Sequence, residues 1–485
     1  MSVGERIVLG PFNRVEGDLE VHLEVAAGRV AAAYVNAPLF RGFEHILRGK
    51  DPRDALVLVP RLCGICSVSQ SAAAAAALRE AIGLAVPANG ELAANLVLAA
   101  ENLADHFTHF YLFFMPDFAR DAYAERPWFA AAQARFKAVR GTAAAEAVPA
   151  RAAFLELTGL LAGKWPHTLS LQPGGSARAV SAAEKVRLYA LLREFRRWLE
   201  RHTFGDTLEA IGALDSIDAL ASWAAARAPA SSDLRLFLEI ADDLGLARIG
   251  RATDRFLSYG AYTLAGRPLF ARGLWQPEEA TVTAFDPDDI REDLSHAWMR
   301  GQTRHPWRGV TEPDPDKDGA YSWCKAPRLA GQVVECGALA RQMVDGHPLA
   351  RDLVAREGGS VRARVLCRLL ELARVLPAME SWVHALRPGE PFCAHGPLPD
   401  EATGCGLVEA ARGALGHWLV IRHGRIASYQ IIAPTTWNFS PRDAAGTPGA
   451  LEQALVGLPV DDARVPLAVQ HVVRSFDPCM VCTVH

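Results

Sequence analysis

The stretch that decides the fold of this chain is Arg61-Leu62-Cys63-Gly64-Ile65-Cys66-Ser67-Val68-Ser69-Gln70-Ser71, which contains a Cys-x-x-Cys pair. An alanine-rich run of helix formers begins directly after it at Ala72 and ends at Gly83, a residue typical of helix C-termini. Thiolates just before the first turn of a helix are stabilised by its free N–H groups and by the positive end of its dipole. Because the thiolate is the form of cysteine that binds soft metals, this stretch is a candidate metal site.

A second pair, Cys479-Met480-Val481-Cys482, lies near the other end of the chain and is followed by His485. One such pair alone is typical of half a structural zinc site or of a redox dithiol. The two pairs are too far apart in sequence to form one local zinc knuckle, but zinc that joins the two ends of a large protein is an alternative. The other cysteines have no regular spacing, which argues against disulfides; they are Cys324, Cys336, Cys367, Cys393 and Cys405.

Composition limits the classes of function. The chain has 485 residues, of which 50% are hydrophobic, and a net charge of −4, so we expect a large core and no binding of nucleic acid. No apolar run is long enough for a membrane span. The N-terminus, Met1–Arg6, lacks the pattern of a secretory signal. Together with the free cysteines, these features favour a reducing cytoplasm.

The hydrophobic pattern predicts an α+β fold that is predominantly helical. Alternating apolar residues predict a small antiparallel sheet over about residues 6–35. The chain from 130 to 300 is expected to be mainly helical, and short strands are expected to end near Ala433. The expected helices cover about 91–115, 146–163, 181–203, 206–225, 232–246, 337–345, 361–386 and 448–457.

The two cysteine motifs resemble the signature motifs of nickel–iron hydrogenase large subunits. The first is Arg61-x-Cys63-Gly64-x-Cys66, and the second is Asp477-Pro478-Cys479-x-x-Cys482-x-x-His485. Both motifs occur in the order of the family and at opposite ends of the chain, and this combination is highly specific. The resemblance covers nearly the whole chain. It implies one compact domain over residues 1–485, with a central helix bundle and small antiparallel sheets.

The resemblance implies a nickel–iron centre held by the four cysteines. Cys63 and Cys479 would bind nickel terminally, whereas Cys66 and Cys482 would bridge nickel to iron. The iron would carry carbon monoxide and cyanide, which the protein does not supply. Four thiolates make a soft, electron-rich site that suits nickel.

The resemblance also implies a magnesium-type ion near this centre. Its ligands would be the carboxylate of Glu44, a backbone carbonyl at about Ile431 and the side chain of His485. Such an ion prefers oxygen ligands and keeps several waters. Without the resemblance, Glu44 would be an ordinary acid at the start of a helix.

Heterolytic cleavage of dihydrogen needs a hydride acceptor and a base that takes the proton. Glu16, in Arg14-Val15-Glu16-Gly17, matches a family glutamate that passes protons, although the pattern alone would make it a turn carboxylate. Arg412 would place a fixed positive charge over the metals. The side chains expected to orient the ligands are Asp105, Asp477 and Gln70.

Electrons would have to leave through a separate subunit. Once the two cysteine pairs are used, no cysteine cluster remains in this chain for iron–sulfur centres. The resemblance therefore implies an iron–sulfur small subunit as the partner, and this subunit alone would carry the clusters.

Three features resemble the hydrogen-sensing regulatory branch of the family. Gln70 stands where catalytic relatives usually have histidine, and the chain stops at His485, as sensors without a processed tail do. Ile65 and Phe113 are bulkier than the residues common at their positions, and we expect them to narrow a gas path and slow the entry of oxygen. A sensor would turn over slowly and would signal to a histidine kinase, for which this chain has no motif.

The sequence therefore predicts the active-site subunit of a regulatory hydrogenase, which oxidises hydrogen reversibly and controls hydrogenase genes. One alternative is the large subunit of an energy-conserving uptake hydrogenase. Another alternative, from a different class, is a structural zinc protein that acts as an interaction scaffold.

Overall fold

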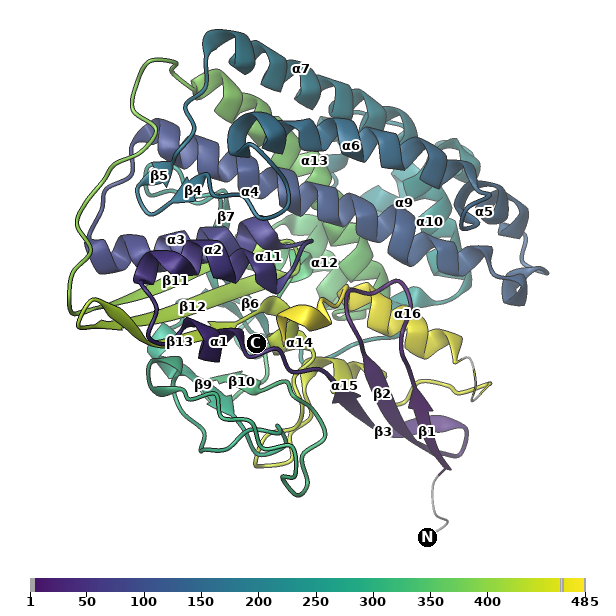
Figure 1. Cartoon of the computed structure of the whole chain (residues 1–485). Helices are drawn as coiled ribbons and strands as arrows, with labels where there is room; N and C mark the ends of the chain where they lie inside the picture. Colours follow the sequence, from purple (N-terminus) through teal and green to yellow (C-terminus); the bar gives the residue numbers. More distant parts are fainter. Residues whose placement is uncertain (1–4, 463, 465, 484–485) are drawn as a thin grey trace.

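Long helices form the centre of the molecule (Figure 1). The computed structural model describes residues 5–462, 464 and 466–483. Helix α4 (Ala88–Thr108) packs against α6 (Thr142–Ala162) and α13 (Val361–Ala385), and α7 (Ala182–Trp198) packs against α6 and α13. Their apolar residues are buried in one continuous core, so the predicted central helix bundle is confirmed.

The N-terminal strands form the predicted antiparallel sheet. Its strands are, in spatial order, β1 (Glu5–Leu9), β2 (Glu20–Ala26) and β3 (Arg29–Asn36). In β2, Val21, Leu23 and Val25 point to the core and alternate with residues that are less buried, as the period of two predicts. The loop between β1 and β2 carries Glu16.

A second antiparallel sheet supports the helix that follows the first cysteine pair. Its strands are β11 (Ala402–Ala410), β12 (Gly413–Arg422) and β13 (Arg425–Ile432). Helix α3 (Ser67–Ile82) packs on β11. A Cβ atom at Gly404 would lie 1.9 Å from the carbonyl oxygen of Ala77, and one at Gly406 would lie 2.0 Å from that of Ala73. The alanine-rich helix can therefore lie flush on the sheet only because glycine faces it.

The expectation that residues 130–300 are mainly helical is wrong in its last part. This part forms the sheet β6 (Phe256–Ala261), β7 (Phe270–Trp275) and β8 (Val282–Thr283), and then β9 (Ile290–Asp293), which pairs with β10 (Ala326–Leu329). Strand β6 is buried along almost its whole length. A short apolar run of this kind cannot be distinguished from a buried helix by its periodicity.

Other differences concern where helices begin and end. The helix expected over 91–115 leaves the α-helical form at Thr108 and continues as a π-helical turn over His109–Phe114. The helix expected over 206–225 is interrupted, and the helices α12 (Pro348–Glu357) and α16 (Leu467–Phe476) were not expected. The remaining elements are α1 (Phe43–Leu47), α2 (Ala55–Leu58), α5 (Phe129–Phe136), α8 (Leu208–Gly212), α9 (Ile217–Ala225), α10 (Asp233–Asp243), α11 (Ala338–Asp345), α14 (Pro434–Asn438), α15 (Ala450–Leu455), β4 (Leu171–Gln172) and β5 (Gly175–Ser176). Among the described helices, none has the length and apolarity that crossing a membrane requires.

Candidate metal centre

Four cysteine sulfurs from the two ends of the chain gather at one point. The Sγ atoms of Cys63, Cys66, Cys479 and Cys482 all lie within 4.8 Å of one another. The distance is 3.3 Å between Cys63 and Cys479, 3.2 Å between Cys66 and Cys482, and 3.1 Å between Cys479 and Cys482. All four thiols are buried and free. The two Cys-x-x-Cys pairs therefore converge as the sequence predicts.

Local structure turns each pair inward. Cys66 is the residue that precedes the first turn of α3. The backbone N–H groups of Ile65 and Cys66 point at the sulfur of Cys63, at 3.2 and 3.4 Å. At the other end, Asp477 terminates α16 in the left-handed conformation, with φ of 57°, and the chain turns so that Cys479 enters the same space.

The four thiols cannot all ionise without a cation. The pKa of the Cys63 thiol lies well below its usual value because Cys479, Cys482 and Cys66 can donate hydrogen bonds to its thiolate. The same contacts raise the pKa of Cys66. Burial raises the pKa of Cys479. A bound metal would offset this charge, and an all-sulfur donor set suits nickel, iron or zinc.

A buried arginine lies between two carboxylates beside the cysteines. Arg412, in the turn between β11 and β12, donates from Nη2 to Asp105 on α4 and to Asp477, each at 3.1 Å. Its Nε also donates to the backbone carbonyl of Asp477 at 2.7 Å. Although burial opposes ionisation, the two carboxylates raise the pKa of Arg412 well above its usual value. The three residues come together as expected, and a fixed positive charge lies near the sulfurs.

Glu16 lies where the N-terminal loop meets the second cysteine motif. Its N–H donates to the carbonyl of Pro478 at 3.3 Å, and its own carbonyl accepts from the N–H of Met480 at 2.7 Å. The side chain is half-buried, and burial together with the negative charge of Cys63 raises the pKa of its carboxyl. A carboxyl that is partly exposed and easily protonated is suited to proton exchange.

Gln70 contacts the site as expected. Its Oε1 lies 2.9 Å from Nε2 of His417, and its Nε2 lies 3.9 Å from the sulfur of Cys482. His417 is in turn 2.9 Å from the hydroxyl of Tyr429. His417 and Tyr429 were not predicted, because nothing in their local pattern indicates that β12 lies against α3.

Sequence reasoning also missed a buried acid on α4. Glu101 accepts hydrogen bonds from the N–H groups of Val68 and Ser69, at 2.8 and 2.9 Å, and from the indole of Trp165 at 3.0 Å. It thereby caps the helix that begins at the first cysteine pair. Burial raises the pKa of Glu101 to about 7. The sequence signal that could have identified Glu101 was an acidic residue on an otherwise apolar helix face, one turn before Asp105.

The predicted magnesium ligands are only partly described. Glu44 accepts a hydrogen bond from the N–H of Ile431 at 2.8 Å, so these two residues do meet, whereas His485 lies outside the described residues. The structure adds Lys325, whose ammonium is 3.1 Å from Glu44 and 3.5 Å from Glu292. Lys325 therefore lies between two buried carboxyl groups, and burial raises the pKa of Glu292 to about 7.

The two residues of the predicted gas path lie in different surroundings. Ile65 is half-buried and packs on the apolar cluster that contains the four cysteines. Phe113 is half-buried in the π-helical turn after α4. Their effect on gas entry stays a prediction.

The chain is similar to known hydrogenases in both sequence and structure. Residues 41–125 and 231–485 match the family described as nickel-dependent hydrogenase. The periplasmic [NiFeSe] hydrogenase large subunit of Desulfomicrobium baculatum is 31% identical, over 99% of this chain and 95% of its own. The uptake hydrogenase large subunit of Azotobacter chroococcum is 27% identical, over 99% and 95%. The nickel–iron–selenium hydrogenase of Desulfovibrio vulgaris Hildenborough has a structure similar to this one, with a TM-score of 0.84, 30% identity and coverage of 99% and 100%.

The chain belongs to the nickel-dependent hydrogenase family and has the fold of its large subunits. It is therefore an oxidoreductase that acts on dihydrogen. The cluster of four cysteines is consistent with a nickel–iron site, and the alternative of a structural zinc scaffold is set aside.

Proposed function

We propose that this chain is the active-site subunit of an uptake hydrogenase, which oxidises dihydrogen to two protons and two electrons. The observation that carries the proposal is the convergence of the four cysteines beside Arg412 and Glu16. The names of the relatives favour this function over a sensor, because they are periplasmic and uptake enzymes. The uptake hydrogenase, which was an alternative on the sequence alone, is therefore the main proposal, and the hydrogen sensor becomes the second candidate.

The cysteines would hold a nickel–iron group whose iron carries carbon monoxide and cyanide. Cys63, Cys66, Cys479 and Cys482 would be its ligands, through their four sulfurs. When bound, this group supplies the hydride acceptor and the redox changes of the reaction. The surrounding apolar cluster excludes water from the sulfurs, which strengthens every charge interaction within it.

Two further side chains would act on charge and protons. Glu16, as the carboxylate, would take the proton released from dihydrogen and pass it towards solvent, since its side chain is half-buried. Arg412 would keep a positive charge beside the thiolates, held by two carboxylates that prevent its rotation.

A magnesium-type ion and an iron–sulfur partner complete the proposal. Glu44, the carbonyl of Ile431 and His485 would hold the ion, and the contact between Glu44 and the N–H of Ile431 supports this set of ligands. Electrons would leave to an iron–sulfur small subunit, as the term large subunit in the names of the relatives suggests. The cytoplasmic location expected from the sequence also stays a proposal.

A hydrogen sensor is the second candidate. The contact of Gln70 with Cys482 and His417 favours it, because glutamine at this position resembles the regulatory branch. A sensor would turn over slowly, would act on a histidine kinase, and would slow oxygen entry through Ile65 and Phe113.

The experiment is to purify the chain with its small subunit and to measure infrared bands and hydrogen oxidation. Bands of metal-bound carbon monoxide and cyanide are expected, with turnover typical of enzymes, about 1–1000 per second. Turnover far below this range would favour the sensor, provided that deleting the gene abolishes hydrogen-dependent induction of another hydrogenase. Absence of the infrared bands from protein that contains nickel would contradict both functions.

A further inference from the structure

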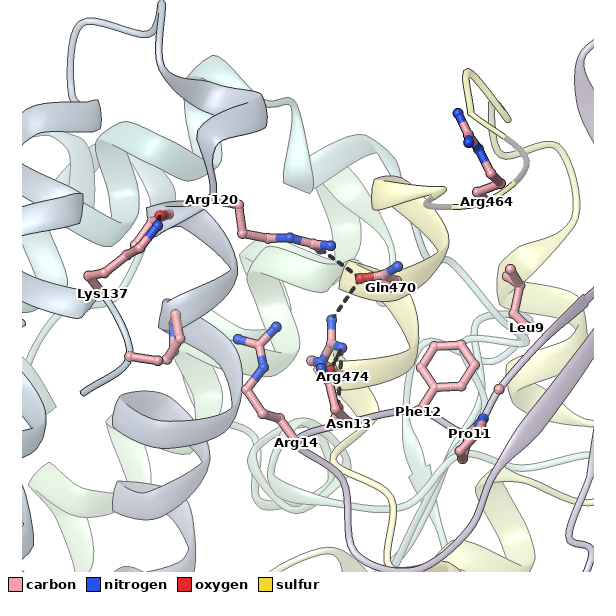
Figure 2. Close-up of a pocket in the computed structure, with 14 residues that line it drawn as sticks. Leu9, Pro11, Phe12, Asn13, Arg14, Arg120, Lys137, Arg464, Gln470 and Arg474 are labelled. Carbon is pink, nitrogen blue, oxygen red and sulfur yellow. Dashed lines mark hydrogen bonds between the residues drawn. The ribbon is translucent and has the colours of Figure 1, made fainter. Parts of the chain in front are cut away.

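A pocket of about 450 Å³ lies between the N-terminal loop and α16 (Figure 2). Five cationic side chains line it, and none of the described residues that line it is acidic. The cationic residues are Arg14, Arg120, Lys137, Arg464 and Arg474. Such a concentration of one sign of charge around a hollow is unusual in a chain whose net charge is −4, and it indicates an anionic ligand.

The neighbouring carboxylate does not neutralise this charge. Asp117 lies beneath the pocket with its side chain fully buried, and both Arg14 and Arg474 donate to it, Arg474 at 2.7 Å. The guanidinium of Arg120 is 3.6 Å from the same carboxylate. One negative charge thus serves three guanidiniums, whereas the cations at the rim have acids of their own: Lys137 lies 3.4 Å from Asp121, and Arg464 lies 3.7 Å from Asp462. Burial, and repulsion by Arg14 and Arg120, lower the pKa of Arg474.

Gln470 marks the position that an anionic oxygen would take. Its Oε1 accepts hydrogen bonds from Nη1 of Arg120 at 2.7 Å and from Nη1 of Arg474 at 3.3 Å (Figure 2). An amide oxygen carries only a partial negative charge, so it orients the two guanidiniums without neutralising them. The fork of a guanidinium fits an oxyanion with two parallel hydrogen bonds.

The guanidiniums differ in how firmly they are held. The Arg474 side chain is 2% exposed and also donates to Oδ1 of Asn13 at 2.7 Å, so it is fixed. The side chains of Arg14 and Arg120 are 22% and 31% exposed, which leaves them accessible from the pocket. The pocket therefore combines one rigid cationic wall with two cationic groups that a ligand can reach.

We propose that this pocket binds an oxyanion, held by Arg120 and Arg14 against the fixed Arg474. The ligand is a tetrahedral oxyanion, such as phosphate or sulfate, or the carboxylate of a partner side chain, and the two share the same recognition chemistry. Arg14 lies two residues before Glu16, and Arg474 lies five residues before Cys479. An oxyanion between them joins the two chain ends that form the metal centre.

The first test is titration calorimetry of the complete chain with inorganic phosphate, at constant ionic strength and with chloride as the reference. Binding of phosphate at one site is expected. Arg120→Gln should weaken it about tenfold, the value of one charge-assisted hydrogen bond. Gln470→Glu should abolish it, because the new carboxylate occupies the oxyanion position with almost no change of shape. Arg187→Gln is the matched control, since Arg187 is exposed and pairs with Glu156 outside the pocket.

The second arm repeats the titration on the complex with the iron–sulfur subunit. Phosphate binding that persists in the complex identifies a free oxyanion. Phosphate binding that is lost in the complex, together with weaker assembly of the Arg120→Gln variant, identifies a carboxylate of the partner. Absence of phosphate binding to the chain, or binding that neither Arg120→Gln nor Gln470→Glu changes, overturns the proposal. None of these measurements depends on the metal centre or on activity.

Discussion

Two buried arginines each hold two carboxylates, but only one of these networks adjoins the cysteines. The first network is centred on Arg412 and the second on Arg341. The carboxylates are those of Asp105 and Asp477 in the first network and those of Glu371 and Glu409 in the second. Every member is buried, so each network places one guanidinium and two carboxyl groups out of water and has the same need for charge balance.

The difference between them is in what else the arginine binds. Arg341 donates to the backbone carbonyls of Ala410 and Ala411, at 2.8 and 2.9 Å, which are the residues just before Arg412. It therefore fixes the turn between β11 and β12 that directs Arg412 to the cysteines. The two guanidiniums therefore have different roles. Arg412 lies beside the cysteines, whereas Arg341 holds the backbone that positions Arg412.

The largest expected effect is on stability and tests the supporting network. Arg341→Met leaves Glu371 and Glu409 buried without a counter-charge, and we expect a loss of about 3–5 kcal/mol in the free energy of unfolding. Urea denaturation at pH 7 measures it. The double variant Arg341→Met with Glu371→Gln should recover part of the loss. A loss below about 1 kcal/mol, the value typical of exposed ion pairs, would contradict the importance of this network.

The next effect separates the two arginines by activity. Arg412→Lys keeps the charge but loses the planar fork beside the thiolates, and we expect hydrogen oxidation per nickel to fall about 100-fold. The matched variant Arg341→Lys should change activity per nickel less than about threefold, because lysine keeps the positive charge and can still donate to a backbone carbonyl that Arg341 holds. Equal losses in the two variants would show that both arginines act only through the fold.

The smallest effect is a difference in pH dependence between the two acids that share Arg341. Burial opposes ionisation of Glu371, but Arg341 and His106 outweigh it and hold its pKa at about 2. Its contribution to stability is therefore complete above about pH 4.5 and is lost as the pH falls towards 2. Burial of Glu409 prevails over Arg341 and raises its pKa to about 7, so stability falls as the pH rises from about 4.5 to 7.

Unfolding free energies between pH 3 and 8 test this difference. Glu371→Gln should reduce the dependence at the acidic end, whereas Glu409→Gln should reduce the fall near neutrality, to which Glu101 also contributes. A single change that flattened both regions would mean that the two carboxyls titrate as one group.

The sequence predicted the site better than the middle of the fold. Both Cys-x-x-Cys pairs, Glu16 and Arg412 could be found because motifs carry them, and alternation was sufficient for the sheet over 6–35. Strands β6–β8 were missed because their short apolar runs lack a period. Helix α16 was missed as well, although it delivers Cys479 to the centre.

The polar residues that surround the site could not be found from local pattern. Glu101, His417 and Lys325 are brought to the centre by α4, β12 and the segment that leads into β10, and each has its partners far away in the sequence. The pairing of distant elements determines such contacts, and a single sequence does not encode it in any short window.

Metal content tests the central claim most directly. Nickel, iron and zinc are measured by mass spectrometry in the complex purified from cells supplied with all three metals. We expect one nickel in each chain and, in Cys482→Ser, the loss of this nickel together with one of the irons of the complex, since the four cysteines would hold both metals as one group. Zinc in amounts equal to the chain, without nickel, would contradict it.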